Sequence, residues 1–368
     1  MIKKLTVSPK AKKPDPMLLG LTLVLTFFGL LMVFNASVVE AFQIFDDKYY
    51  FSKLQLTWIG AGLAAMAAAA FLPLRLVKKL ATPTILVTLV LLGLVLIPGV
   101  GSEFHGARRW LSFGEFNLQP TELAKLALII YLSAWLTLAR SFWRFLAILA
   151  AVLILIMLQP DLGTALIVIF TAVIVYYASG APIFYLLAVG VLGSISGLGL
   201  IFSSAYRRER LLTYLNPGAD PLGSSYHIRQ ALIAIGSGGL FGLGLGQSRQ
   251  KYQFLPQATT DSIFAIVAEE VGFVGSAVLI VIFTLLILRI LKIARFASDD
   301  FSRLLTTGIA GWIGLQVMVN IAAMLALVPL TGVPLPLISY GGSAMIATLS
   351  GLGLVLNVSR YQLSPKKK

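Results

Sequence analysis

The sequence predicts an all-α, polytopic integral membrane protein with about ten transmembrane helices and a large extracytoplasmic loop between helices 7 and 8. Hydrophobic residues make up 58% of the 368 residues and charged residues only 12%, whereas soluble domains carry about 25% charged residues. Apolar segments of about 20 residues, the length that a helix needs to cross a bilayer, recur along most of the chain. Little sequence remains for a separate soluble domain.

The predicted spans follow one another from the N-terminal tail to the C-terminal tail. The first span is too long for a signal-peptide core, so we expect it to be retained. It follows a basic tail at residues 1–16, and a second basic tail at residues 361–368 ends the predicted membrane domain at residue 360. In order, the predicted spans are 17–39, 53–73, 82–98, 120–139, 145–158, 162–179, 182–203, 262–288, 304–328 and 339–357.

The distribution of charge predicts the orientation. Ten spans place both tails on one side, and that side also collects the basic residues of the short loops at 75–79, 140–144 and 289–303. Short loops rich in Lys and Arg face the cytoplasm, so we expect both termini to be cytoplasmic.

Composition excludes several classes of function. A chain without cysteine has no disulfide, thiolate nucleophile or cysteine-ligated metal, and two histidines are too few for a histidine-rich metal site. The net charge of +14 in so apolar a chain favours anionic lipid over nucleic acid as a partner. The glycines of residues 236–246 match neither a Walker loop nor a dinucleotide fingerprint, so we expect no ATP site.

The long external segment, residues 204–261, is predicted to hold structure of its own. Pro and Gly between residues 216 and 221 mark turns. Residues 225–247 form an apolar stretch with too many glycines for a span. We expect a short helix that lies at the interface or dips into the membrane, followed by a glycine-rich turn, because irregular backbone at that depth must be surrounded by protein or a cavity.

Candidate chemistry concentrates between residues 246 and 275. Asp261, Glu269 and Glu270 lie at or inside an apolar helix, where charged side chains are expensive and indicate function. On a continuous helix, Asp261 shares a small, polar face with positions that extend to Ser276, Glu269 lies near its edge and Glu270 points away. Asp261 fits two roles, an N-cap and a general base at the outer membrane face.

A second set of charges lies in the segment QPTELAKLALII. Glu122 and Lys125 have i, i+3 spacing just after Pro120. A structural ion pair is favoured over a catalytic role, although such a pair beside a cavity could still orient substrate. Asp161, in LQPDLGTAL, is expected to cap its helix rather than to react.

Several cations outside the cytoplasmic side are candidates for binding an anionic ligand. Arg108 and Arg109, beside a Trp, fit an interfacial anchor and a phosphate-binding site equally well. The cations of the long loop are expected to face solvent or headgroups for the most part, with one or two holding a pyrophosphate, for which Arg forks are well shaped. These candidates are Arg208, Arg210, Arg249 and Lys251.

Four long motifs, in this order, resemble the SEDS family (shape, elongation, division and sporulation) of bacterial cell-wall polymerases. They are GARRWLSFGEFNLQPTELAKLA at 106–127, QPDLGTALIV at 159–168, the stretch from NPGADPLG to AEEVGFVG at 216–275, and PLTGVPLPLISYGGSAMIATLSGLGLVLNVSR at 329–360. The resemblance covers nearly the whole chain. GLGLGQSRQKYQFLP is more similar to the FtsW division branch than to the RodA elongation branch.

The resemblance implies a peptidoglycan glycosyltransferase that acts on lipid II, the undecaprenyl-pyrophosphate-linked disaccharide-peptide. Asp261 matches the essential external-loop aspartate of the family in TTDSIFA, and Glu122 and Lys125 match its ion pair in QPTELAK. Ser262 is a departure, since the family usually has Phe at this position.

The chemistry of these residues fits that implication. Pyrophosphate is a good leaving group once its charge is offset, so one carboxylate and nearby cations suffice. Asp261 would deprotonate the GlcNAc 4-hydroxyl of lipid II, which attacks the anomeric carbon of the lipid-linked strand with inversion. The sequence requires no cofactor and leaves a divalent cation, Mg²⁺ or Mn²⁺, as an option.

The resemblance also implies partners and a location. They are the nascent glycan strand, a class B penicillin-binding protein that supplies transpeptidation, and other divisome membrane proteins, in the bacterial cytoplasmic membrane at the division septum. Three other functions remain open: a lipid II flippase, a RodA-like elongation polymerase, and a division scaffold in which Asp261 is only a cap.

Overall fold

The computed structural model describes residues 5–6, 12–104, 107–114, 116–138, 141–185, 225–252, 254–362 and 364–365, together with isolated positions between 189 and 214. Helices dominate this part of the chain. They are α1 (Pro16–Phe45), α2 (Tyr50–Phe71), α3 (Leu74–Lys79), α4 (Ala81–Leu94), α5 (Pro120–Leu136), α6 (Phe142–Leu158), α7 (Leu162–Ala178), α10 (Tyr226–Ser237), α11 (Ile263–Arg295), α12 (Asp300–Met324) and α13 (Gly342–Ser359).

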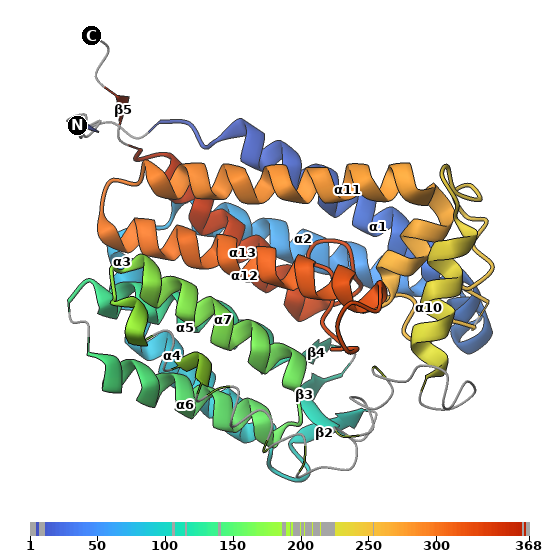
Figure 1. Cartoon of the computed structure of the whole chain (residues 1–368), viewed down its shortest axis with the longest axis horizontal. Coiled ribbons are helices and arrows are strands. Elements are labelled where there is room, and N and C mark those ends of the chain that lie inside the picture. The colour runs from blue at the N-terminus through green and yellow to red at the C-terminus, as the bar shows by residue number, and fades with distance from the viewer. Residues whose placement is uncertain are drawn as a thin grey trace.

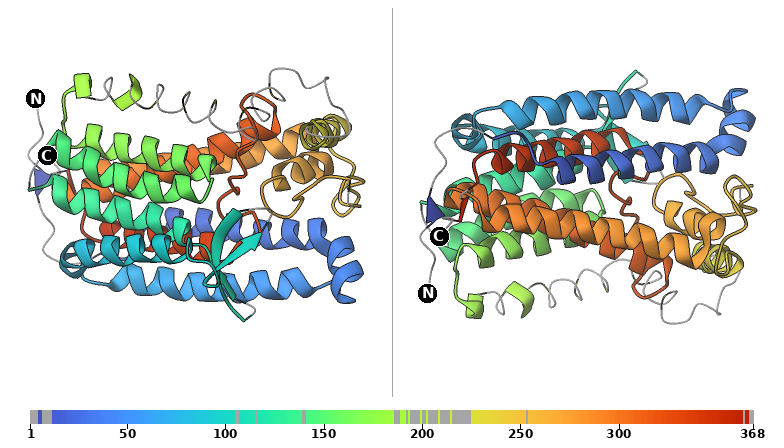
Figure 2. Two further views of the ribbon diagram at one scale, coloured as in Figure 1. Left: turned by 90° about the horizontal axis from the view of Figure 1, so that it is seen from below. Right: turned by 90° about the horizontal axis from the view of Figure 1, so that it is seen from above.

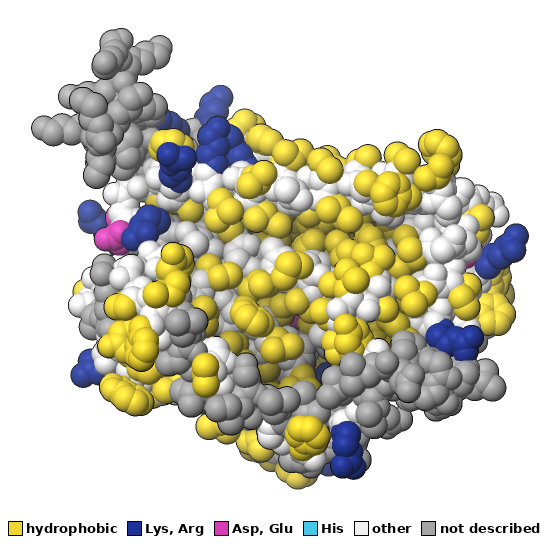
Figure 3. Space-filling model, in the orientation of Figure 1, with side chains coloured by type: hydrophobic (Ala, Val, Ile, Leu, Met, Phe, Trp, Pro, Cys, Tyr) yellow, Lys and Arg dark blue, Asp and Glu magenta, His cyan; other side chains and the backbone are white. Residues whose placement is uncertain are grey.

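The long helices run side by side along one axis and form a bundle (Figures 1 and 2). Both chain ends lie at one end of the bundle and α10 lies at the other, while a small sheet lies between the middle of the bundle and the α10 end (Figure 1). Five helices, α1, α2, α11, α12 and α13, are long and apolar enough to cross a membrane, and α4, α6 and α7 are shorter apolar helices. Apolar side chains cover the middle of the face seen in Figure 3, and the Lys and Arg side chains lie toward its margins. This pattern is that of a membrane-spanning bundle.

Nine of the ten predicted spans each overlap one helix of the described residues. In order, these helices are α1, α2, α4, α5, α6, α7, α11, α12 and α13. The remaining span, 182–203, lies mostly outside the described residues. The short interfacial helix expected in the long loop corresponds to α10.

A three-stranded antiparallel sheet between α4 and α5 was not predicted. It consists of β2 (Gly101–Phe104), β3 (Ala107–Phe113) and β4 (Phe116–Leu118), in the order β2-β3-β4. A separate two-residue pair joins β1 (Leu5–Thr6) to β5 (Ser364–Pro365) near the chain ends. The class is therefore a helical membrane bundle with a small sheet in the half of the bundle away from the termini (Figure 1).

The expectation of one continuous helix through residues 262–288 is wrong, because α11 is broken at Gly272 (φ 69°, ψ −170°). Residues 239–244 run beside the break and replace the lost helical hydrogen bonds. The N–H groups of residues 243 and 244 donate to the carbonyls of Glu269 and Glu270, and the N–H groups of residues 273 and 274 donate to the carbonyls of residues 239 and 240. Ser276, beyond the break, therefore does not continue the face that begins near Asp261.

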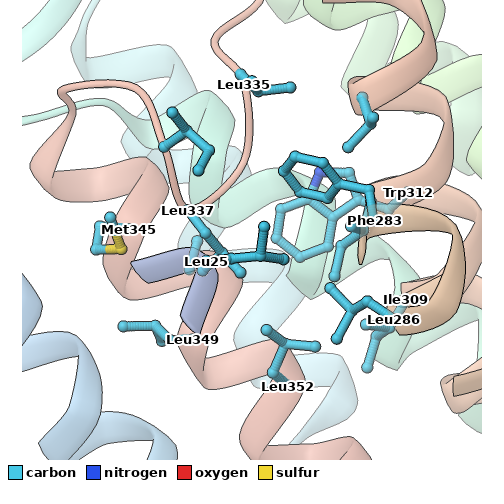
Figure 4. Close-up of a cluster of buried hydrophobic side chains, with 14 of the residues drawn as sticks. Leu25, Phe283, Leu286, Ile309, Trp312, Leu335, Leu337, Met345, Leu349 and Leu352 are labelled. Atoms are coloured by element: carbon cyan, nitrogen blue, oxygen red, sulfur yellow. The ribbon is translucent and has the colours of Figure 1, made fainter. Parts of the chain in front are cut away.

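A hydrophobic core joins α1, α11, α12 and α13 to the loop that leads into α13 (Figure 4). Trp312 of α12 is fully buried at its centre. Leu335 and Leu337 bring the loop into the same cluster (Figure 4). The loop at the site end of the bundle is thus packed against the core rather than free in solvent. The labelled members of this cluster are Leu25, Phe283, Leu286, Ile309, Trp312, Leu335, Leu337, Met345, Leu349 and Leu352.

Candidate active site

Asp261 lies in the turn immediately before α11, at the end of the bundle opposite the chain termini. Its side chain is half-buried, and Oδ1 accepts a hydrogen bond from the hydroxyl of Thr260 at 2.7 Å. The N-cap of α11 is Ser262, not Asp261, so the capping interpretation of Asp261 is wrong. Among the described residues no Lys or Arg forms an ion pair with Asp261, which leaves this carboxylate able to accept a proton or bind a cation.

Three successive carbonyls hold the backbone at Asp261 in place. The carbonyl of Thr259 accepts from the N–H of Tyr340 at 2.9 Å, and that of Thr260 accepts from the Ser339 hydroxyl at 2.5 Å. The carbonyl of Asp261 accepts from the side-chain amide of Asn320 at 2.8 Å. The turn is therefore fixed to α12 and to the loop before α13.

The same loop connects Asp261 to the beginning of α7. Gly332 (φ 69°) faces Asp261 so closely that a Cβ at this position would lie 3.6 Å from Oδ2. A Cβ on Gly163 would lie 2.4 Å from the carbonyl oxygen of Thr331. The α6–α7 turn and Asp261 thus lie on two sides of one short loop segment.

Arg109 of β3 is attached to that α6–α7 turn. Its Nε donates to the carbonyl of Gln159 at 2.9 Å, and Nη2 donates to the carbonyl of Pro160 at 2.6 Å. Asp161 caps α7, accepting from the N–H of Thr164 at 3.1 Å, as its sequence context predicted. Arg108, on the same strand, is half-buried. Arg109 is thus bonded to the turn that precedes α7, and Asp161 serves as the N-cap of that helix.

The predicted ion pair is present inside the bundle. Lys125 Nζ lies 2.8 Å from Glu122 Oε1, and each side chain is 2% exposed. Lys125 also donates to Gln316 Oε1 of α12 at 2.9 Å and lies over the ring of Trp312. Glu122 Oε2 is buried without a hydrogen-bond partner among the described residues. Because charges buried in this way must be paired, each member of the pair neutralises the other, and the bond from Lys125 to Gln316 joins α5 to α12.

Glu269 organises the loop that precedes Asp261. Its carboxylate accepts from the hydroxyl of Ser248 at 2.5 Å and from the backbone N–H groups of Arg249 and Gln250 at 3.0 and 3.4 Å. This buried carboxylate contacts the loop rather than the surroundings of Asp261. The Arg249 side chain itself is exposed.

Glu270 and Lys251 form a second buried pair, 3.7 Å apart. Sequence reasoning expected Glu270 only to point away from the Asp261 face. The structure gives it a second partner as well, the amide of Asn35 in α1 at 3.1 Å. Lys251 is 6% exposed and its charge is balanced by Glu270, so it stabilises the loop and does not remain a pyrophosphate candidate. Arg208 is exposed, and Arg210 lies outside the described residues.

Sequence reasoning missed His227 and the role of Ser262. Ser262 is fully buried, and its hydroxyl donates to the carbonyl of Pro256 at 2.9 Å. His227 Nε2 of α10 lies 2.6 Å from the same hydroxyl oxygen. A hydroxyl has one proton to donate, so Nε2–H is the donor in this second bond. Ser262 therefore attaches α10 to the turn of Asp261.

Sequence reasoning also missed two amide side chains of α12, Gln316 and Asn320. Both are 1% exposed, and both hydrogen-bond to segments that surround Asp261. The signal was present in the sequence, since these polar residues lie four positions apart in an apolar helix and so share one face.

Comparisons with known proteins agree along almost the whole chain. Residues 16–364 match the FtsW/RodA/SpoVE family, described as cell cycle proteins. The chain is 41% identical to the stage V sporulation protein E of Bacillus subtilis, covering 96% of this chain and 99% of that protein. It is also 41% identical to a probable peptidoglycan glycosyltransferase FtsW of Geobacter metallireducens, covering 94% of each.

Two solved structures are similar in fold as well as in sequence. One is a chain from a peptidoglycan synthase complex described as coordinating polymerization and crosslinking, with a TM-score of 0.79, 33% identity and coverage of 94% of this chain and 98% of that one. The other is the rod shape determining protein RodA of Thermus thermophilus, with a TM-score of 0.70, 33% identity and coverage of 95% and 98%.

Proposed function

Because the chain belongs to the FtsW/RodA/SpoVE family, the SEDS family, we propose that it polymerises peptidoglycan glycan strands from lipid II, with release of undecaprenyl pyrophosphate, in septal cell-wall synthesis. The chain is a peptidoglycan glycosyltransferase by enzyme class, and several relatives that are 37–41% identical to this chain carry that name. The observation that supports the proposal most is the carboxylate of Asp261, which has no cationic partner among the described residues and lies on a turn whose three carbonyls are all fixed.

In this proposal Asp261 is the general base. It accepts the proton of the GlcNAc 4-hydroxyl of lipid II as that oxygen attacks the anomeric carbon of the lipid-linked strand. Direct attack inverts the anomeric centre, and the bond to pyrophosphate breaks on the opposite side. The carboxylate suits this task because, among the described residues, its side-chain hydrogen bond comes from Thr260 within the turn, and Oδ2 faces the Gly332 side.

Cations near the site would offset the charge of the departing pyrophosphate. Arg108 and Arg109 reach the site end on β3, and Arg249 and Arg208 are exposed on the long external segment. Arg guanidinium groups bind phosphate oxygens in a bidentate way. A divalent cation, Mg²⁺ or Mn²⁺, also fits this donor set, since a carboxylate and pyrophosphate oxygens are the ligands that hard cations prefer.

The arrangement of the bundle supports an external reaction. Both chain ends lie at the end of the bundle opposite α10 (Figure 1). With the termini in the cytoplasm, as the charge distribution predicts, Asp261 lies at the outer face of the cytoplasmic membrane. The substrate then supplies the energy through its pyrophosphate bond.

The proposal includes a partner. A chain of a peptidoglycan synthase complex is similar to this protein over 94% of its length. That similarity supports a class B penicillin-binding protein that crosslinks the strands made here. Other divisome membrane proteins are proposed on the resemblance to the FtsW branch.

The experiment uses the purified chain with its cognate class B penicillin-binding protein and labelled lipid II in detergent, with glycan strands separated on a gel. The wild type is expected to make long strands, and Asp261→Asn to make none while it unfolds at the wild-type temperature. Asp161→Asn is the matched control, because Asn replaces Asp well as an N-cap, and it should remain active. Equal strands from wild type and Asp261→Asn would exclude Asp261 as the base. No strands from either protein, with lipid II translocation in vesicles, would favour the flippase.

A further inference from the structure

We propose that Asn320 is a positioning residue that holds the general base Asp261 in place, and that α12 connects it through Gln316 to the ion pair of Glu122 and Lys125. The inference rests on the proposed role of Asp261. It assigns to α12 a function in the reaction beyond that of a membrane span.

Asn320 joins the two segments that face each other at the site. Its Nδ2 donates one proton to the carbonyl of Asp261 and the other to the carbonyl of Val333, both at 2.8 Å. An amide nitrogen has two protons, so its donor capacity is fully used. Val333 follows Gly332, whose Cα faces the carboxylate of Asp261. One side chain therefore bonds both to the backbone of the base itself and to the loop segment that faces its carboxylate.

Gln316 repeats this arrangement one helical turn earlier. Its Nε2 donates to the carbonyl of Pro334 at 3.0 Å, so successive turns of α12 hold successive carbonyls of the loop. Its Oε1 accepts from Lys125 Nζ at 2.9 Å and from Trp312 Nε1 at 2.8 Å. Trp312 is packed in the hydrophobic core (Figure 4). Through α12, the turn of Asp261 is thus connected to the buried core of the bundle.

Asn320 acts through Asp261 and not on the substrate. It is 1% exposed, and both of its donor protons are used within the protein. Without this amide, two carbonyls lose their donors, and among the described residues the turn is held to the loop only through Ser339 and Tyr340. A misplacement of about 1 Å at a reacting group lowers the rate about 100-fold. We therefore expect a defect in kcat with little change in KM.

The chain offers a matched control in Asn357 of α13. This residue is also 1% exposed, and its Nδ2 donates to the carbonyls of Ala69 and Leu72 at 2.8 and 2.5 Å. It makes the same kind of contact near the end of the bundle that holds the termini. Asn357→Ala therefore reports what the loss of a buried, doubly bonded amide does to folding alone.

The first measurement compares Asn320→Ala and Asn357→Ala in the lipid II assay, with the unfolding temperature of each. We expect both to unfold at a lower temperature than the wild type. Only Asn320→Ala should lower kcat, by about 10- to 100-fold, with KM changed less than about threefold. A kcat for Asn320→Ala equal to that of Asn357→Ala would overturn the inference.

The second measurement does not depend on activity, so it separates failure of this inference from failure of the proposed function. The chain has no cysteine, and Asp261→Cys therefore introduces its only thiol, at the position of the base. The rate of its reaction with a membrane-impermeant maleimide is measured alone, with Asn320→Ala, and with Asn357→Ala. We expect the rate to change at least threefold with Asn320→Ala and to stay constant with Asn357→Ala. Equal rates in all three proteins would overturn the inference.

Asn320→Ser provides for the case in which Asn320→Ala does not fold. A hydroxyl donates one hydrogen bond, so it can satisfy only one of the two carbonyls. If Asn320→Ala folds, we expect a kcat and a labelling rate for Asn320→Ser between those of Asn320→Ala and the wild type. If Asn320→Ala does not fold, we expect Asn320→Ser to have a lower kcat than the wild type and a changed labelling rate. Wild-type values for both quantities would contradict a positioning role.

Discussion

Lys125→Met is the most informative test of the buried charges. The substitution removes an ammonium group from a site where Lys125 and Glu122 are each 2% exposed and 2.8 Å apart. Met preserves most of the volume, so the change is mainly one of charge. Glu122 is left without its counter-ion, and its Oε2 already has no hydrogen-bond partner among the described residues. Removing one member of a buried pair costs about 3–5 kcal/mol of stability.

The assay is thermal unfolding of the purified protein in detergent, with the lipid II assay alongside. Lys125→Met should lower the unfolding temperature by several degrees and reduce activity, because Gln316 also loses a donor. The double variant with Glu122→Gln should recover much of the lost stability, since neither charge then remains buried. Lys53→Met is the control, because Lys53 pairs with Asp47 at the surface and is 69% exposed. It should leave the unfolding temperature unchanged.

Two results would refute this reasoning. Unfolding of Lys125→Met at the wild-type temperature would show that Glu122 is solvated or protonated without its partner. A double variant no more stable than Lys125→Met would show that the loss comes from packing against Trp312 rather than from charge.

Three further predictions use the same unfolding assay. Gly272→Ala should destabilise the protein by about 1–3 kcal/mol, because φ is 69° and a Cβ would lie 2.3 Å from the nitrogen of Gly242. Gly93→Ala is the control and should not destabilise the protein, because its Cβ would meet nothing within 4 Å. Ser262→Ala should cost about 1–3 kcal/mol by removing the buried hydroxyl that bonds to His227 Nε2 and to the carbonyl of Pro256, and a wild-type unfolding temperature would contradict those bonds. Burial raises the pKa of Asp15, but hydrogen bonds from Arg289 and from the N–H of Leu18 outweigh it, so the pKa lies below its usual 3.8. Stability from this carboxylate is therefore present above pH 3.8 and lost as the pH falls through the lowered pKa. Asp15→Asn, which keeps the N-cap, should unfold at a lower temperature than the wild type at pH 7, and the difference should disappear in acid.

Part of the site could be predicted from sequence because its contacts are local. Glu122 and Lys125 lie one helical turn apart, and Asp161 caps a helix that begins at the next residue. The sequence identifies Asp261 as a charge at the beginning of an apolar helix. The structure was needed to show that Asp261 does not hold the N-cap position. The N-cap position of α11 is Ser262, one residue further along, whose side chain makes no capping hydrogen bond.

Other features could not be predicted because their partners are distant in the chain. The break in α11 is tolerated only because residues 239–244 supply the missing hydrogen bonds. From sequence, Lys251 is a candidate ligand for phosphate, but in the structure it is buried and paired with Glu270. The small sheet was missed because its strands are short and lie between two spans, where no periodic pattern of apolar residues develops.

The sequence by itself determined that this protein is a helical membrane bundle, because a run of about 20 apolar residues has few alternatives to spanning as a helix. It also determined the order of the spans and the family motifs. Only the tertiary structure decided how the base is held, since Asn320 lies 59 residues from Asp261 and Gln316 lies 191 residues from Lys125. A helical pattern reveals which side chains share a face, but the donor that meets a given carbonyl depends on how the helices pack.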